Sequence, residues 1–142
     1  MINRFFHFVH DLSISLYQLT DGKFGGRVQG LQVLLLTTTG RKTGRERTTP
    51  RWYFMENDNY IITASNAGRD THPAWFYNLR ANPHVRIEIQ DRQIEAEAEV
   101  VAPQKRSALW SQLISLSPAY ANYAKKTSRE IPLVILRPLR NE

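Results

Sequence analysis

A cluster of cations lies in one short stretch of the chain, between Gly40 and Arg51. This stretch holds five lysine or arginine residues against one glutamate, so it carries +4 of the formal net charge of +6. Gly40 and Gly44 allow the backbone to approach a ligand closely, and threonine hydroxyls in the same stretch can donate hydrogen bonds. Guanidinium groups match the geometry of phosphate and carboxylate oxygens. The stretch therefore predicts a loop that binds a compact anion; a solvated hairpin turn is the alternative.

The composition of the whole chain excludes several kinds of chemistry. The chain has 142 residues and no cysteine, which excludes a disulfide scaffold, a thiol nucleophile and a thiolate metal site. It shows no convincing Ser-His-Asp order and no metal-ligand cluster, so we expect no metal site. Outside the cationic stretch the net charge is only +2, which argues against a nucleic-acid interface. No apolar run approaches the roughly 20 residues that cross a bilayer, and the lack of cysteine fits a reducing compartment, so we expect a cytoplasmic protein.

The hydrophobic pattern predicts a single α+β domain over residues 1–142. Short connections indicate a mostly antiparallel sheet, and such a sheet hides its edges most economically by closing into a small barrel. We expect strands at 31–39, 47–54, 59–65, 85–90, 94–100 and 131–137. We expect helices at 1–20, 71–81 and 118–126, and a further helix that opens at Pro103.

Two of the expected helices leave an alternative open. Residues 1–20 form an amphipathic pattern rich in phenylalanine, which favours packing on the domain over contact with a membrane or a partner. In the helix at 118–126, Tyr120 and Tyr123 fall on one face, which by itself indicates a packed face.

The helix at 71–81 carries mostly structural signals. Trp75 and Phe76 belong to its apolar face and are expected in the core. His72 has no second ligand nearby in the sequence, so a structural hydrogen bond is a better prediction than a metal or a catalytic base.

Two long motifs carry a family resemblance. The run LLLTTTGRKTGRERTTP at 34–50, followed by ITASNAGRDTHPAWFYNLRANPHV at 62–85, resembles the deazaflavin (coenzyme F420)-dependent nitroreductase family. That family belongs to the split β-barrel flavin and deazaflavin oxidoreductases. The segment at 118–134, with its two tyrosines and Arg129, resembles the family's C-terminal signature, so the likeness covers nearly the whole chain. The resemblance implies a split β-barrel of about six strands with flanking helices.

The resemblance also implies an activity and a cofactor. The implied reaction is hydride transfer from reduced coenzyme F420 to a quinone or another electron-poor acceptor, with nitroreduction as a promiscuous activity. A cofactor that carries the hydride at a ring carbon needs binding and orientation from the protein rather than a side-chain nucleophile. Its anionic tail would explain the cationic loop.

Site residues follow from the resemblance position by position. The phosphate and glutamyl tail would lie against Arg41, Lys42 and Arg47, and the chain would pass beside the cofactor at Thr49 and Pro50. The residues implied to meet the deazaflavin ring or to close around the cofactor are Ile62, Thr63, Ala64, Ser65, His72, Pro73, Ala74, Trp75 and Asn78. The candidate catalytic residues, implied to orient the acceptor, are Ser65, Tyr120 and Tyr123.

The sequence also departs from the family pattern around the expected mouth of the pocket. Arg51 stands after Pro50 where an aliphatic residue is usual, and Asn66-Ala67-Gly68 replaces a common double glycine. These departures bear on the choice of acceptor and of cofactor. The alternatives left open are an FMN-dependent enzyme of the same fold and a non-catalytic carrier of a flavin, a deazaflavin or haem. The sequence leaves the oligomeric state undecided.

Overall fold

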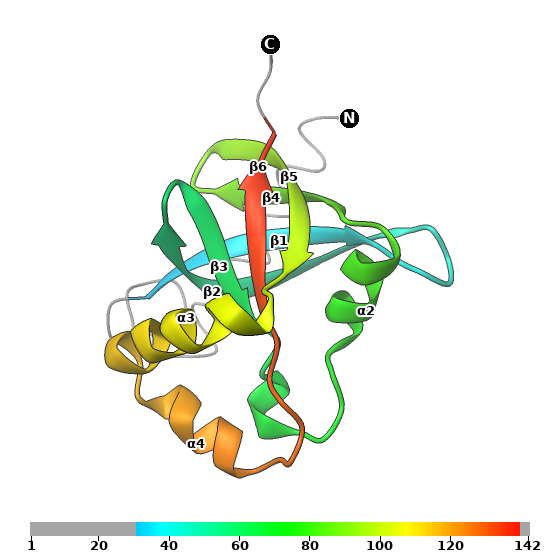
Figure 1. Ribbon diagram of the computed structural model, residues 1–142. Coiled ribbons are helices and arrows are strands. Elements are labelled where there is room, and N and C mark those ends of the chain that lie inside the picture. Colours follow the sequence, from blue (N-terminus) through cyan, green and yellow to red (C-terminus); the bar gives the residue numbers. More distant parts are fainter. Residues whose placement is uncertain (1–30, 140–142) are drawn as a thin grey trace, which may run out of the picture.

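The computed structural model describes residues 31–139 and shows six antiparallel strands that close into a barrel (Figure 1). Around the barrel the strands follow the order β1-β2-β3-β6-β5-β4, and every neighbouring pair is antiparallel. The expected α+β barrel is therefore confirmed. The predicted helix at 1–20 lies outside the described residues. The strands are β1 (Gln32–Thr39), β2 (Glu46–Glu56), β3 (Asn59–Thr63), β4 (His84–Ile89), β5 (Arg92–Val100) and β6 (Leu133–Pro138).

The inside of the barrel is a closed apolar core. Successive side chains of a strand point to opposite faces, so every second residue of each strand points into the barrel. From β1, Leu34 and Leu36 face this core, and Ile87 of β4 and Leu136 of β6 meet them there; each is at most 1% exposed. The barrel interior is therefore filled by side chains, so a ligand must bind at its mouth or on its outer wall.

Helices cover the barrel on two sides. These are α2 (Ala74–Ala81), α3 (Pro103–Leu116) and α4 (Ala119–Lys125), together with a short 3-10 turn, η1 (Asn66–Gly68). Trp75, Phe76 and Leu79 of α2 join the barrel core, whereas α3 and α4 pack through a second cluster against the outer wall. Figure 1 shows α3 and α4 together at one end of the barrel, and α2 on the side toward which the loop between β1 and β2 projects.

The boundaries of several elements differ from the sequence prediction by a few residues, and the structure gives a local reason for two of the larger differences. The strand expected at 59–65 ends at Thr63, because Asn66 and Ala67 adopt positive φ angles of 49° and 56° and turn the chain into η1. The helix expected from residue 71 begins at Ala74, because Pro73 is extended and disfavours helical geometry in the residue before it.

The last strand begins later than expected, and the helix before it is shorter by one residue at each end. Residue 131 was the expected start of the last strand, but β6 begins at Leu133, since Pro132 has no N–H to donate to the ladder. The helix expected at 118–126 spans Ala119–Lys125, with Pro118 at its cap.

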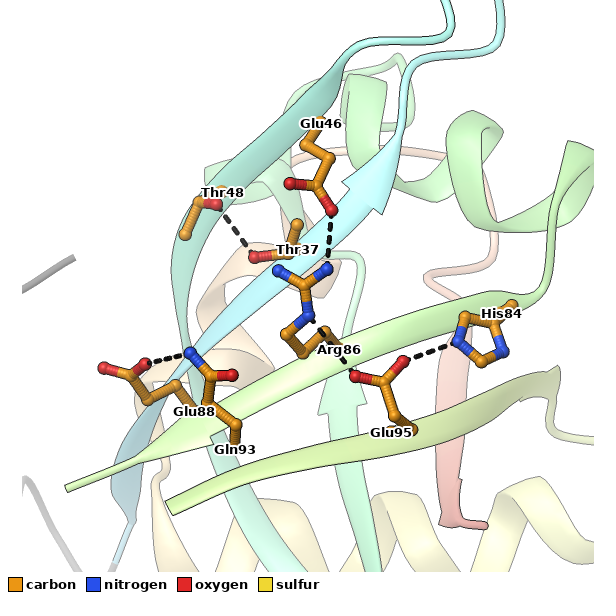
Figure 2. Close-up of polar contacts among 8 residues, drawn as sticks. All are labelled: Thr37, Glu46, Thr48, His84, Arg86, Glu88, Gln93 and Glu95. Carbon is orange, nitrogen blue, oxygen red and sulfur yellow. Dashed lines mark hydrogen bonds and ion pairs between the residues drawn. The ribbon is translucent and has the colours of Figure 1, made fainter. Parts of the chain in front are cut away.

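A polar network braces the outer face of the barrel at the base of the cationic loop (Figure 2). Arg86 of β4 donates to Glu46, the first residue of β2, at 2.7 Å, and its Nε lies 3.3 Å from the Glu95 carboxylate of β5. Glu95 also pairs with His84 at 2.6 Å. The network joins three strands, so the start of β2 is held where the loop ends. In the described part of the chain, no helix is long and apolar enough to span a membrane.

Candidate functional site

A pocket of about 410 Å³ opens between the cationic loop and α2. Three cations line it, namely Arg41, Lys42 and Arg47, and among residues 31–139 no acidic side chain lines it. The remaining lining residues are Gly40, Thr43, Thr49, Ala74, Trp75 and Asn78. Two parts of the chain, the hairpin that contains the cationic loop and the first half of α2, thus meet at one concave, electropositive surface.

Gly40 and Gly44 fix the shape of the cationic loop. The Gly40 N–H donates to the carbonyl oxygen of Arg45 at 2.7 Å, and the Gly44 N–H donates to the carbonyl oxygen of Gly40 at 2.8 Å. Gly44 has a φ of 73°, which disfavours a side chain. A Cβ at Gly40 would lie 2.9 Å from the Thr43 hydroxyl and 3.1 Å from the Arg45 carbonyl oxygen. The loop is therefore a tight, self-bonded turn that presents its cations outward.

Asn78 of α2 ties the loop to the helix. Its side-chain oxygen accepts a hydrogen bond of 3.1 Å from the Arg41 N–H, and its amide donates to the Thr38 hydroxyl at 3.3 Å. The Arg41 guanidinium lies 4.9 Å from the ring centre of Tyr77, the preceding residue of α2. Asn78 is buried, so this brace positions the first cation of the loop relative to α2.

Trp75 leaves a buried donor beside the pocket. Its indole Nε1 is buried and has no hydrogen-bond partner within residues 31–139, and the residue lines the pocket. A buried donor without a partner is costly, and a ligand oxygen would satisfy it. Together with three cations and the hydroxyls of Thr43 and Thr49, this donor set fits a ligand that combines phosphate or carboxylate oxygens with an aromatic or carbonyl-bearing ring.

Arg129 organises the segment that joins β3 to α2. Its Nη2 donates to the carbonyl oxygens of Ser65 at 2.8 Å and Ala64 at 3.2 Å, and its Nε donates to the carbonyl oxygen of Arg69 at 2.8 Å. Its Nη1 lies 3.0 Å from Nδ1 of His72. One side chain therefore holds four points of this connection.

The His72 imidazole is the acceptor in that contact. Burial lowers its pKa below the usual value of 6.5, and the charges of Arg129 and Arg80 lower it further. The imidazole is therefore neutral at pH 7 and accepts from Arg129 through Nδ1. Its ring also lies 4.7 Å from that of Phe76. Within residues 31–139 no group of three or more histidine, aspartate and glutamate residues could hold a metal ion.

Tyr120 and Tyr123 form an edge-to-face pair on α4. Their ring centres are 5.4 Å apart at an interplanar angle of 87°. Tyr120 is buried, and burial raises its pKa to about 12, with Tyr123 adding to the rise and Arg51 opposing it. At neutral pH Tyr120 is therefore a phenol, which can donate a hydrogen bond to an oxygen that gains negative charge.

The structure brings together some of the predicted site residues and separates others. Arg41, Lys42, Arg47, Thr49, Ala74, Trp75 and Asn78 all line the pocket. Pro50, Ile62, Thr63, Ala64, Ser65, His72 and Pro73 are not among its lining residues, and neither are Tyr120 and Tyr123. Ser65 is nevertheless linked to His72 through Arg129, and Tyr120 is linked to the pocket-lining Trp75 through Arg51.

Sequence reasoning missed the role of Arg129 and the contacts of Arg51. The connection between β3 and α2 is more than 50 residues away from Arg129 in the sequence, so no periodicity could have revealed these hydrogen bonds. In the sequence Arg51 is one of the five cations of the 40–51 stretch and a departure from the family pattern, and neither signal indicates its contact with Trp75. Gly40 and Thr43 belong to the predicted anion loop, but only the structure places them on the pocket wall.

Comparison with known proteins identifies the family. A family model described as F420H(2)-dependent quinone reductase matches residues 11–138. The chain belongs to this family. The resemblance expected from the two long motifs is thereby confirmed at the level of deazaflavin-dependent reductases.

Individual relatives agree with this assignment to the F420H(2)-dependent quinone reductases. The chain is 39% identical over 133 residues to an F420H(2)-dependent quinone reductase of Mycobacterium tuberculosis (strain ATCC 25618 / H37Rv), covering 90% of this chain and 87% of that protein. A solved F420-H2 dependent reductase is 35% identical, with a TM-score of 0.68, over 74% of this chain and 93% of the other. A solved domain-swapped dimer is 30% identical, with a TM-score of 0.69, over 92% of this chain and 98% of the other.

Proposed function

We propose that this protein is an F420H2-dependent quinone reductase. The observation that carries the proposal is the electropositive pocket beside α2, in a chain that belongs to the F420H(2)-dependent quinone reductase family. When bound, the reduced deazaflavin supplies a hydride from a ring carbon. In the net reaction F420H2 gives two electrons and two protons to the quinone, which leaves F420 and the hydroquinone.

The residues of the pocket would bind the cofactor through its anionic tail. Arg41, Lys42 and Arg47 carry the charge that phosphate and glutamyl carboxylates require, and their side chains are exposed enough to reach a ligand. The buried Trp75 indole N–H, which has no partner within residues 31–139, would offer a donor for a ring carbonyl oxygen. The pocket therefore suits the cofactor through its positive charge and its hydrogen-bond donors.

The acceptor would be oriented by hydroxyl donors at the end of the barrel where α4 lies. A quinone oxygen gains negative charge as hydride arrives, and a preorganised neutral donor stabilises that charge. Tyr120 is such a donor, because its raised pKa keeps the proton on the phenol. Tyr123 packs against it, and Ser65 lies at the end of β3, where Arg129 fixes its backbone. A nitro group could accept electrons at the same place, which would give nitroreduction as a side activity.

The first test measures cofactor binding. We expect that K42A and R47A each raise the dissociation constant for F420, measured by fluorescence titration. In the double variant, which carries both substitutions, the rise should be about tenfold or more. Both side chains are exposed, so the unfolding midpoint should stay unchanged. R92A is the matched control, because Arg92 is an exposed cation at the turn between β4 and β5. Unchanged affinity in the double variant would contradict this assignment of the loop.

The second test separates this function from its alternatives. Absorption titrations of the purified protein with F420, FMN and haem compare the three ligands directly, and we expect saturable binding of F420 at the lowest concentration. Adding menadione to the F420H2 complex should then restore the absorption of oxidised F420. A protein that binds the reduced cofactor but leaves it reduced would be a carrier, and preferential binding of FMN would support the FMN-dependent alternative.

A further inference from the structure

Arg51 is a cation on the inner face of the barrel. It is two residues from Thr49, which lines the pocket, and two residues from Tyr53, which belongs to the barrel core, so the three side chains share one face of β2. Its register partner on β1 is Leu34, which is 1% exposed. Arg51 itself is half-buried, so its guanidinium loses part of its solvation there while one side stays open to solvent.

The described residues around Arg51 do not supply a counter-charge. No carboxylate of residues 31–139 forms an ion pair with it. Its Nε donates to the carbonyl oxygen of Pro50, and its guanidinium carbon lies 5.6 Å from the ring centre of Trp75. Within that part of the chain, the terminal amino groups of the guanidinium have no hydrogen-bond acceptor. Burial lowers the pKa of Arg51, yet an arginine remains charged at neutral pH.

The position of Arg51 separates it from the anion-binding pocket. It is not among the lining residues of the pocket, where Arg41, Lys42 and Arg47 already provide positive charge. It contacts the pocket-lining Trp75, and its charge acts on the Tyr120 hydroxyl, which belongs to the other end of the proposed site. Arg51 therefore connects the place expected for the deazaflavin ring with the place expected for the acceptor.

We propose that Arg51 determines acceptor specificity by binding an ionised substituent of the quinone. The substrate class would then be a ring acceptor that carries an anionic oxygen, such as a hydroxyquinone in its ionised form, a carboxylate or a sulfonate. The planar guanidinium offers paired N–H donors to such a group, and Trp75 beside it offers an aromatic face to the ring. This inference rests on the proposed function, because it names the kind of acceptor that the same site takes.

A binding experiment tests the inference without turnover. The probes are naphthalene-2-sulfonate and its neutral counterpart naphthalene-2-sulfonamide, titrated by calorimetry into the protein loaded with oxidised F420. The wild type should bind the sulfonate more tightly than the sulfonamide. R51L should raise the dissociation constant of the sulfonate about tenfold or more, and that of the sulfonamide by less than about twofold. R51K keeps the charge but loses the planar guanidinium, so its affinity for the sulfonate should lie between those of the wild type and R51L.

A kinetic experiment tests the same point during reduction. With F420H2 as donor, the acceptors are 1,4-naphthoquinone-2-sulfonate and menadione, and the quantity compared is the ratio of their kcat/KM values. We expect R51L to lower this ratio about tenfold or more, since each acceptor's own reactivity cancels when variants are compared. R92L is the matched control and should leave the ratio unchanged, because Arg92 is exposed at the tip of the β4–β5 hairpin.

Three outcomes would overturn the inference. The first is that R51L raises the dissociation constants of the sulfonate and the sulfonamide equally. The second is that R51L changes neither dissociation constant. The third is a rise in the F420 dissociation constant of R51L as large as that for the sulfonate, because Arg51 would then bind the cofactor. If the wild type reduces neither quinone, the proposed function fails by itself, while the two naphthalene probes still decide the role of Arg51.

Discussion

The guanidinium of Arg129 donates a hydrogen bond of 2.8 Å to the backbone carbonyl oxygen of Ser65. This contact joins the segment before β6 to the segment after β3, although the two residues are far apart in the sequence. The same guanidinium reaches the carbonyl oxygen of Arg69 and the His72 ring. Arg129 thus supports the path of the chain from β3 to α2, together with local hydrogen bonds such as that of 2.9 Å from the Gly68 N–H to the Ser65 carbonyl oxygen.

Replacing Arg129 should destabilise the fold as well as the site. R129A leaves several carbonyl oxygens without a charged donor, so we expect it to lower the free energy of unfolding by about 1–3 kcal/mol. R129K keeps the charge but can satisfy fewer acceptors, so it should fall between R129A and the wild type. Urea unfolding measures the effect, and R92A serves as a surface control expected within about 0.5 kcal/mol of the wild type. An R129A protein as stable as R92A would contradict this role.

Gly68 is the point where η1 meets α4. It has a φ of 79°, and a Cβ there would lie 2.8 Å from the carbonyl oxygen of Tyr123 and 3.0 Å from Cβ of Lys126. We expect G68A to cost about 2–4 kcal/mol, because backbone strain and a clash with α4 add together. It should also lower turnover, since α4 must move away and takes Tyr123 with it.

Gly44 provides the control for the backbone strain at Gly68. Its φ is 73°, but a Cβ there would meet nothing within 4 Å. G44A should therefore show only the strain, about 1–2 kcal/mol. Urea unfolding of both variants gives the comparison, and equal losses of stability would show that the contact between Gly68 and α4 is unimportant.

The barrel and the cationic loop could be predicted from the sequence because both depend on local patterns. Val85 and Ile87 alternate with polar residues along one strand, and the charges between Gly40 and Arg51 lie close together in the chain. The contacts of Arg129 and Arg51 could not be predicted in this way. Each depends on side chains from elements that only the closed barrel and the packing of α2 and α4 bring together.

The pKa of Tyr120 makes a prediction about the pH dependence of turnover. Burial raises this pKa to about 12, so the phenol keeps its proton across the range in which the enzyme can be assayed. Y120F should lower kcat/KM for menadione by about tenfold or more, because one preorganised donor is lost. The control is Y53F, since the Tyr53 hydroxyl already donates its hydrogen bond to Gln32 at 2.8 Å. In the wild type, a loss of activity centred near pH 10 that disappears in Y120F would contradict the prediction.

The lowered pKa of His72 predicts a loss of stability on acidification. In the folded protein the pKa of His72 lies below the usual value of 6.5, whereas in the unfolded chain it lies near that value. The contribution of His72 to the free energy of unfolding is therefore complete above about pH 6.5 and is lost as the pH falls from there through the lowered pKa. The cause is that the imidazolium can no longer accept a hydrogen bond from Arg129. H72Q keeps an acceptor oxygen but does not titrate, so its free energy of unfolding should fall less than that of the wild type between pH 8 and pH 5. Parallel urea-unfolding profiles for the wild type and H72Q over this range would show that the neutral imidazole does not contribute.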